Sequence, residues 1–106
     1  MIVIGIIPVR MNSSRFPGKP MKKIHGMPMV GHCYERTNLA PGIQKTYVAT
    51  CDNEIVDYIN SIGGNSIMTS IKHKRATTRT AEALEKIEIH LAKKVDVIVM
   101  VQGDEP

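Results

Sequence analysis

Aromatic residues are scarce in this 106-residue sequence, which has no tryptophan, one phenylalanine and three tyrosines. Proteins that bind looped or single-stranded nucleic acid depend on aromatic side chains that stack on the bases. The sequence also contains no base-stacking motif. We therefore expect no nucleic-acid partner, and nucleic-acid binding is the least favoured class of function.

Cysteines and long apolar runs are also few. Cys33 and Cys51 stand far apart, so they form neither a metal-binding pair nor a disulfide framework, and we expect reduced thiols. The apolar segment Met1 to Val9 lacks the preceding positive charge and the small-residue cleavage site of a signal peptide. No run approaches the ~18 apolar residues of a membrane span. We expect a cytoplasmic protein with no membrane partner.

Acidic residues are missing from two long stretches. None occurs before Glu35, and none lies between Asp57 and Glu82. The formal net charge of +4 and the pI near 9.2 therefore arise largely from these two basic segments. Such concentrations of positive charge indicate an acidic partner, which could include a small polyphosphate.

The first basic segment follows the apolar run Ile2 to Ile7, which predicts a buried strand. Ligands of open α/β sheets bind beyond the carboxyl ends of strands. The alternative is a solvated surface loop, because charged side chains are mostly exposed. The length of the segment and the turn at Pro17-Gly18 favour a functional loop. Its candidate phosphate-binding residues are Arg10, Ser13, Ser14, Arg15 and Lys19.

The second basic segment, residues 69–80, is a second candidate ligand loop. His73 has no second ligand at metal-binding spacing, so we interpret it as a hydrogen-bonding loop histidine. Thr77 or Thr78 is predicted to cap the helix that follows. Asp52, after the predicted strand 45–50, could face a ligand, but an N-cap is the favoured role for an aspartate there.

Strands and helices alternate along the chain. We predict strands at residues 2–7, 45–50, 66–68 and 95–101, the last being the strongest. Helices are predicted near 28–39, 53–62 and 77–91, each with a helical apolar stripe. This order implies an α/β fold with a Rossmann-like parallel sheet and flanking helices, so the loops after the strands should share one rim. The last of these loops holds Asp104, a possible Mg²⁺ ligand beside the cations.

The blocks IIPVRMNSSRFPGKPM, PMVGHCYERT, YVATCDNEI, MTSIKH and VQGDEP occur in this order along the whole chain. They resemble the N-terminal part of the 3-deoxy-manno-octulosonate (KDO) cytidylyltransferases. In the segment RATTR, Arg75 and Ala76 stand where that family usually has serine and glycine.

The resemblance implies a nucleotide-diphospho-sugar transferase fold and transfer of CMP from CTP to a 2-keto-3-deoxy sugar acid, with Mg²⁺ as cofactor. It assigns Arg10, Ser13, Arg15 and Lys19 to the triphosphate loop, with Arg15 and Lys19 the catalytic candidates. It assigns the metal to Asp104 and the remaining nucleotide contacts to Thr69, Ser70, Thr77, Arg79 and Gln102. Full-length members are dimers by the same resemblance; the state of this chain stays open.

A domain seldom ends on the loop after its best strand. We therefore expect residues 1–106 to be the N-terminal, nucleotide-binding part of a longer cytidylyltransferase domain that is inactive alone. The alternatives are an N-acylneuraminate-type or other sugar cytidylyltransferase and a CTP-binding fragment without turnover.

Overall fold

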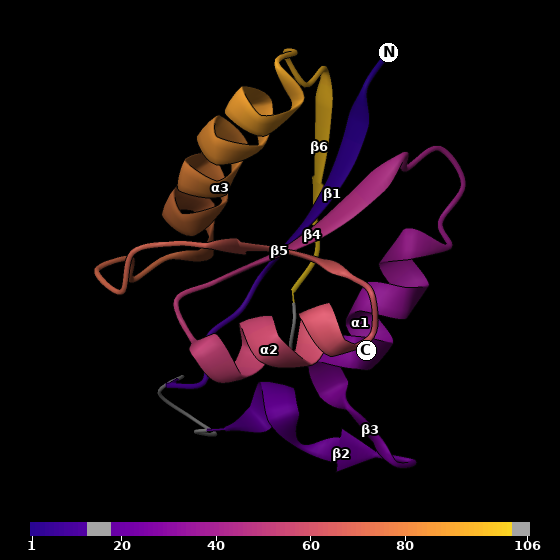
Figure 1. Ribbon diagram of the computed structural model, residues 1–106, viewed down its shortest axis with the longest axis vertical. Helices are drawn as coiled ribbons and strands as arrows, with labels where there is room; N and C mark the ends of the chain where they lie inside the picture. Colours follow the sequence, from indigo (N-terminus) through magenta and orange to yellow (C-terminus); the bar gives the residue numbers. More distant parts are fainter. Residues whose placement is uncertain (13–17, 103–106) are drawn as a thin grey trace.

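The structure, a computed structural model, describes residues 1–12 and 18–102 and is built from strands that alternate with helices (Figure 1). A 3-10 helix and a short hairpin stand between the first strand and the first long helix. In chain order the elements are β1 (Val3–Pro8), η1 (Lys19–Met21), β2 (Lys23–Ile24), β3 (Met27–Pro28), α1 (Met29–Asn38), β4 (Lys45–Thr50), α2 (Asn53–Ser61), β5 (Asn65–Met68), α3 (Ala76–Leu91) and β6 (Val97–Met100).

Four of the strands form one parallel sheet in the order β5-β4-β1-β6. β1 pairs with β4 on one side, where Ile6 lies opposite Tyr47, and with β6 on the other, where Ile4 lies opposite Ile98. The remaining two strands, β2 and β3, form a separate antiparallel hairpin. The predicted α/β fold with a parallel sheet and flanking helices is therefore confirmed.

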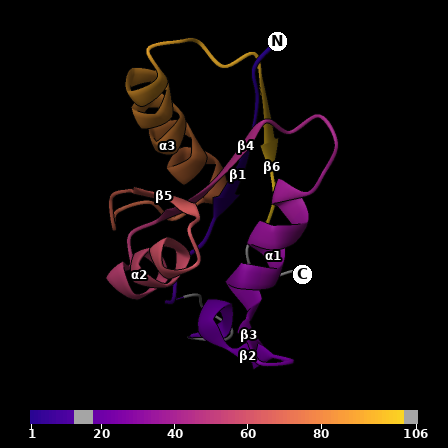
Figure 2. The same cartoon turned by 45° about the vertical axis from the view of Figure 1, so that its right-hand side comes forward.

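The helices cover both faces of the sheet (Figures 1 and 2). Side chains alternate between the two faces of a strand, so neighbouring residues of β1 enter different cores. One core joins Ile7 to side chains of α1 and α2, including Val30 and Ile55. The other joins Ile4 and Ile6 to α3, where Ala83 and Ile87 are fully buried. α3 therefore crosses the sheet on the face opposite α1 and α2.

Several element predictions need correction. β6 is shorter than the strand predicted at residues 95–101 and lies at the edge of the described sheet, where Val97 and Met100 are both 41% exposed. α3 begins at Ala76 with Arg75 as its N-cap residue, so Thr77 and Thr78 lie inside its first turn and do not cap it. The helix predicted at residues 53–62 ends at Ser61, so Ile62 follows α2 and is 37% exposed. The predicted apolar face of α1 is buried throughout.

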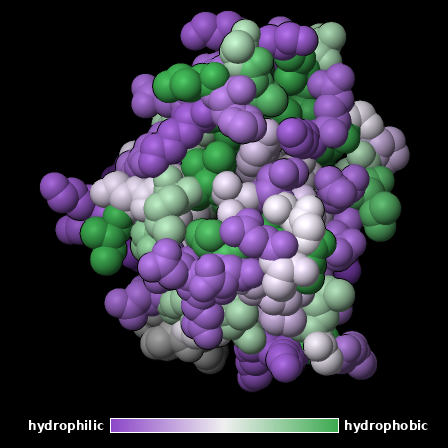
Figure 3. Space-filling model, viewed as in Figure 1, coloured by the Kyte–Doolittle hydropathy of each residue, from purple (hydrophilic) through white to green (hydrophobic). Residues whose placement is uncertain are grey.

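Figure 3 shows the polarity of one face of the molecule. On the face seen in Figure 3, hydrophilic side chains dominate and apolar groups are scattered between them. Within the described residues, no helix is long and apolar enough to cross a membrane.

The close approach of β1 to α1 predicts a specific sensitivity at Gly5. A Cβ atom at this position would lie 2.8 Å from Cγ2 of the buried Thr37. We expect Gly5→Ala to lower the free energy of unfolding by about 1–3 kcal/mol, measured by urea denaturation, because two packed elements must move apart.

The double variant Gly5→Ala/Thr37→Ser removes the opposing methyl group and should recover part of this loss. We expect a coupling free energy of at least about 0.5 kcal/mol between the two sites in the double-mutant cycle. Strictly additive effects would contradict the proposed contact.

Candidate nucleotide-binding site

The strand order reverses at β1. From β1 the chain builds the sheet outward through β4 to β5, and α3 then carries it back to β6 on the other side of β1. A crevice forms beyond the carboxyl ends of parallel strands at such a switch point, and ligands of open α/β sheets bind there. The carboxyl ends of β1 and β6, followed by Val9-Arg10 and Gln102, therefore mark the expected site.

The segment after β1 is anchored by hydrogen bonds at both of its described ends. The Val9 amide donates to the Ala49 carbonyl at 3.0 Å, and the Met11 amide donates to Oδ2 of Asp52 at 2.8 Å. The Gly18 amide donates to the Met11 carbonyl at 2.7 Å. Gly18 has a φ of +80°, a backbone conformation that suits glycine, and η1 begins at the next residue.

Asp52 thus has a different role from the one favoured by the sequence. It occupies the N-cap position of α2, yet its side chain makes no capping hydrogen bond. Its Oδ2 atom instead accepts from the Met11 amide and, at 3.5 Å, from the Thr50 hydroxyl. The carboxylate therefore links the segments that follow β1 and β4.

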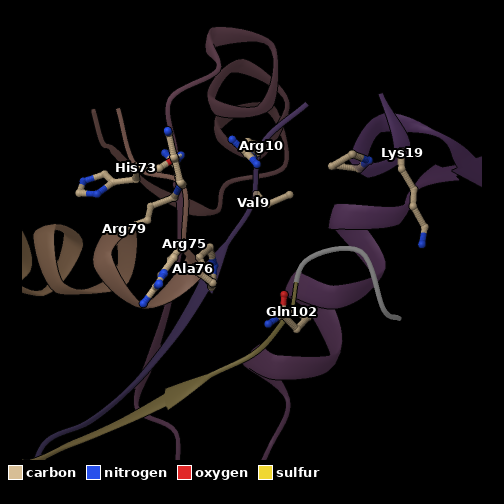
Figure 4. A pocket seen from close by; sticks show the side chains of 11 residues that line it. Val9, Arg10, Lys19, His73, Arg75, Ala76, Arg79 and Gln102 are labelled. Carbon is tan, nitrogen blue, oxygen red and sulfur yellow. Dashed lines mark hydrogen bonds between the residues drawn. The ribbon is translucent and has the colours of Figure 1, made fainter. Parts of the chain in front are cut away.

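A pocket lies at this switch point and is lined by residues from four parts of the chain. In Figure 4, Arg75 and Arg79 on the α3 side and Lys19 on the η1 side flank Arg10 and Gln102. The described lining carries several lysine and arginine side chains and no carboxylate. The described lining residues are Pro8, Val9, Arg10, Lys19, Pro20, His73, Lys74, Arg75, Ala76, Arg79 and Gln102.

Residues 69–75, which we call the basic loop, carry three of these lining residues and are held by side chains of α3. Arg79 is buried, with 3% of its surface exposed. Its guanidinium donates to Oγ1 of Thr69 at 2.6 Å and to the carbonyls of Ser70 and His73 at 3.3 Å each. The basic loop is therefore fixed to the first turns of α3 from inside the protein.

Glu82 holds the same loop from the next turn of α3. Its Oε1 accepts the Ser70 amide at 2.9 Å and lies 2.6 Å from Nε2 of His73, while Lys86 contacts Oε2 at 2.8 Å. Hydrogen bonds from Lys86, the Ser70 amide and His73 together lower the pKa of Glu82 to about 2. His73 is thus a hydrogen-bonding loop histidine, as the sequence predicts.

The structure brings some of the predicted site residues together and separates others. Arg10, Lys19, Arg79 and Gln102 line the pocket. Thr69 is buried against Arg79, and Ser70 and Thr77 are absent from the lining, so their nucleotide contacts stay predictions. The predictions for Ser13, Ser14, Arg15 and Asp104 lie outside the described residues.

The site list drawn from the sequence omits three lining residues of one segment, His73, Lys74 and Arg75. Their position in the second basic segment is the sequence feature that could have identified them as site residues. The sequence led to no predicted role for Glu82 in the site. The available signal was its place as the first acid after the basic run, since an acid there can neutralise that run.

The pocket fits phosphate better than it fits a bare metal ion. Arginine and lysine bind phosphate oxygens through charge-assisted hydrogen bonds. Within residues 1–12 and 18–102, no group of three or more histidine, cysteine or acidic residues could hold a metal. Mg²⁺ often binds through one or two carboxylates together with substrate phosphates. The predicted metal site depends on Asp104 and stays a prediction.

A parallel α/β sheet with a cationic pocket at its switch point defines an open α/β protein with a candidate anion-binding site. Residues 4–106 match the sequence profile of the cytidylyltransferase family, and the chain belongs to that family.

Similar proteins include KDO-type cytidylyltransferases, which confirms the resemblance seen in the sequence. The chain is 45% identical over 100 residues to 3-deoxy-manno-octulosonate cytidylyltransferase 2 of Hydrogenovibrio crunogenus. This match covers 94% of this chain and 39% of that protein. It is 44% identical to 8-amino-3,8-dideoxy-manno-octulosonate cytidylyltransferase of Shewanella sp. strain W3-18-1, covering 100% of this chain and 42% of the relative.

A solved structure agrees with the sequence relatives. CMP:2-keto-3-deoxy-manno-octonic acid synthetase complexed with CTP superposes with a TM-score of 0.90 at 38% identity, covering 100% of this chain and 42% of that one. The nucleotide-diphospho-sugar transferase fold is therefore confirmed. The chain spans about two fifths of the length of these relatives.

The hydrogen bond between Asp52 and Met11 predicts how the segment after β1 responds to mutation. We expect Asp52→Ala to raise the exchange rate of the Met11 amide about tenfold, measured by hydrogen exchange, since a hydrogen bond to a charged group contributes ~1.5–3 kcal/mol. Asp52→Asn keeps an oxygen acceptor and should cause a smaller rise. Fraying of the first turn of α2 with an unchanged Met11 amide would instead support a capping role.

The low pKa of Glu82 predicts a dependence of stability on pH. The folded carboxyl group titrates near 2 and the ordinary value is 4.5, so its stabilising contribution is present above pH 4.5 and is lost as the pH falls toward 2. Urea denaturation of wild type and Glu82→Gln should therefore give a difference in unfolding free energy that is constant above pH 5 and shrinks below pH 4.5.

Glu85→Gln is the matched control, because it changes an exposed carboxylate on the same helix. A Glu82→Gln difference that does not change with pH would contradict the assigned shift.

Proposed function

We propose that this chain is the nucleotide-binding part of a cytidylyltransferase that transfers CMP from CTP to a 2-keto-3-deoxy sugar acid of the KDO type. The observation that carries the proposal is the cationic pocket at the switch point of the sheet, lined by Arg10, Lys19 and Arg75. Membership of the cytidylyltransferase family supplies the class of reaction. The similarity to KDO-type enzymes supports the sugar class and a role in lipopolysaccharide synthesis.

In the proposed reaction, the anomeric hydroxyl oxygen of the sugar attacks the α-phosphorus of CTP. The bond from that phosphorus to the bridging oxygen breaks, pyrophosphate leaves with the bonding electrons, and the hydroxyl proton passes to solvent. Such transfers depend on positioning and on stabilising the charge that develops on the phosphate oxygens. Arg10 and Lys19 would supply the positive charge that stabilises these oxygens, together with Arg15 from the same sequence segment. Gln102 would contact the nucleoside or sugar.

The metal and the remaining partners belong to the same proposal. Mg²⁺ would supply further neutralisation of the triphosphate, with Asp104 as its protein ligand. The acceptor sugar could be KDO or its 8-amino derivative, since similar relatives carry both names. The acceptor site would lie outside residues 1–106, which would leave this chain able to bind CTP without turnover. We place the reaction in the cytoplasm.

An N-acylneuraminate-type enzyme remains the second candidate within the family, and the block VQGDEP disfavours it. The choice of sugar can be tested only in an enzyme that contains the acceptor site. The nucleotide preference can be tested in this chain directly.

We expect CTP with Mg²⁺ to bind the 106-residue chain more tightly than ATP, GTP or UTP, as measured by isothermal titration calorimetry. Lys19→Ala should weaken CTP binding by about tenfold, because a charge-assisted hydrogen bond contributes ~1.5–3 kcal/mol. The melting temperature should change little. Lys93→Ala removes an exposed lysine beyond the far end of α3 and should leave the affinity unchanged.

Equal affinities for all four triphosphates would reduce the pocket to a general anion site. A loss of affinity in Lys93→Ala as large as in Lys19→Ala would show that only the overall charge matters.

A further inference from the structure

Two side chains of α3 reach back to the loop that precedes their own helix. Arg79 donates to the carbonyls of Ser70 and His73, whereas Glu82 accepts the Ser70 amide and contacts the His73 ring. At both Ser70 and His73, the carbonyl group thus contacts the cation Arg79. The Ser70 amide and the His73 ring contact the anion Glu82, which lies about one helical turn further along α3. This arrangement fixes both the position and the orientation of the basic loop relative to the first turn of α3.

The charge distribution gives Glu82 a particular importance in this arrangement. The segment from 72 to 79 carries Lys72, Lys74, Arg75 and Arg79, and no acidic residue lies between Asp57 and Glu82. Like charges that are held close together repel one another, and an opposite charge in contact with the group offsets the repulsion. Among the described residues, Glu82 is an acid that contacts the basic loop directly, through the Ser70 amide and the His73 ring, so it brings negative charge to this basic segment.

The position of the basic loop matters for the pocket because its C-terminal half lines it. His73, Lys74 and Arg75 are lining residues, and His73 is a lining residue that both Arg79 and Glu82 contact. A shift of the loop would therefore move three lining residues together, two of them lysine or arginine.

We propose that Glu82 is a positioning residue of the pocket: it holds the basic loop so that Lys74 and Arg75 face the phosphates of the bound nucleotide. The identity of the ligand rests on the proposed function, whereas the position of the loop does not. Glu82 itself is not a lining residue, so its effect on the ligand acts through the basic loop.

The sign of the mutational effect separates this role from simple electrostatics. Glu82 carries negative charge near an anion-binding pocket, so its removal should strengthen anion binding if charge alone matters. If Glu82 positions the basic loop, its removal should weaken binding, since the loop cations lose their fixed place. The two explanations predict opposite changes in the dissociation constant.

α3 offers a matched control at Glu88. Its Oε2 accepts the Val95 amide at 2.8 Å, so it holds the segment after the helix much as Glu82 holds the segment before it. Its Oε1 lies 3.8 Å from Nζ of Lys94. Glu82→Ala and Glu88→Ala each remove one negative charge and one acceptor for a backbone amide from α3. Glu88, however, lies away from the lining of the pocket.

The experiment measures CTP–Mg²⁺ affinity by calorimetry and amide hydrogen exchange of residues 69–75, in the 106-residue chain. For Glu82→Ala we expect a dissociation constant raised by about tenfold or more, the effect of losing a charged hydrogen bond, and faster exchange in the basic loop. Glu82→Gln keeps an oxygen acceptor and should fall between wild type and Glu82→Ala. Glu88→Ala should speed exchange near Val95 without weakening CTP binding.

Unchanged or tighter CTP binding by Glu82→Ala would overturn the proposal, as would weaker binding with unchanged exchange in the basic loop. If Glu82→Ala does not fold, the folded Glu82→Gln variant decides by the same two criteria. Absence of CTP binding by wild type would refute the proposed function instead. In that case the exchange rates alone decide whether Glu82 positions the loop, and unchanged rates would refute it.

Discussion

Parallel pairing of β1 with both β4 and β6 is the constraint on which the rest of the structure depends. Because parallel neighbours require crossover connections, the chain must return over the sheet after each strand. The first two crossovers place α1 and α2 on one face, and the third places α3 on the other. The change of face coincides with the reversal of strand order, so the carboxyl end of β1 has a loop from β6 on one side and the first turn of α3 nearby.

The elements with strong local signals could be predicted from the sequence. Lys45–Thr50 forms a strand with the predicted bounds, and the apolar stripe of α1 is buried from Met29 to Thr37. The run VDVIVMV correctly predicted the strand β6, although its apolar character does not show which strands flank it. A central position and an exposed edge are decided by the order of strands in space.

The candidate site was partly predictable for a related reason. The rule that ligands bind beyond strand ends placed Arg10, Lys19 and Gln102 at one pocket. The same rule says nothing about which polar groups hold the loops. Asp52 was expected to cap α2, yet the Met11 amide competes for its carboxylate. That partner lies 41 residues away in the sequence, beyond the reach of any local preference for aspartate at an N-cap.

η1 has a thermodynamic consequence for the binding of an anion. Lys19 opens this short helix, its neighbour Pro20 is fully buried, and the backbone turns back on itself through the bond from the Lys22 amide to the Lys19 carbonyl. Fixing the backbone of one residue costs about 1–2 kcal/mol of entropy, and folding of the chain has already met that cost at Lys19. At this residue, association then has only the side chain left to order, which costs about 0.5–1.5 kcal/mol. More of the attraction between ammonium and phosphate is thus left as net affinity.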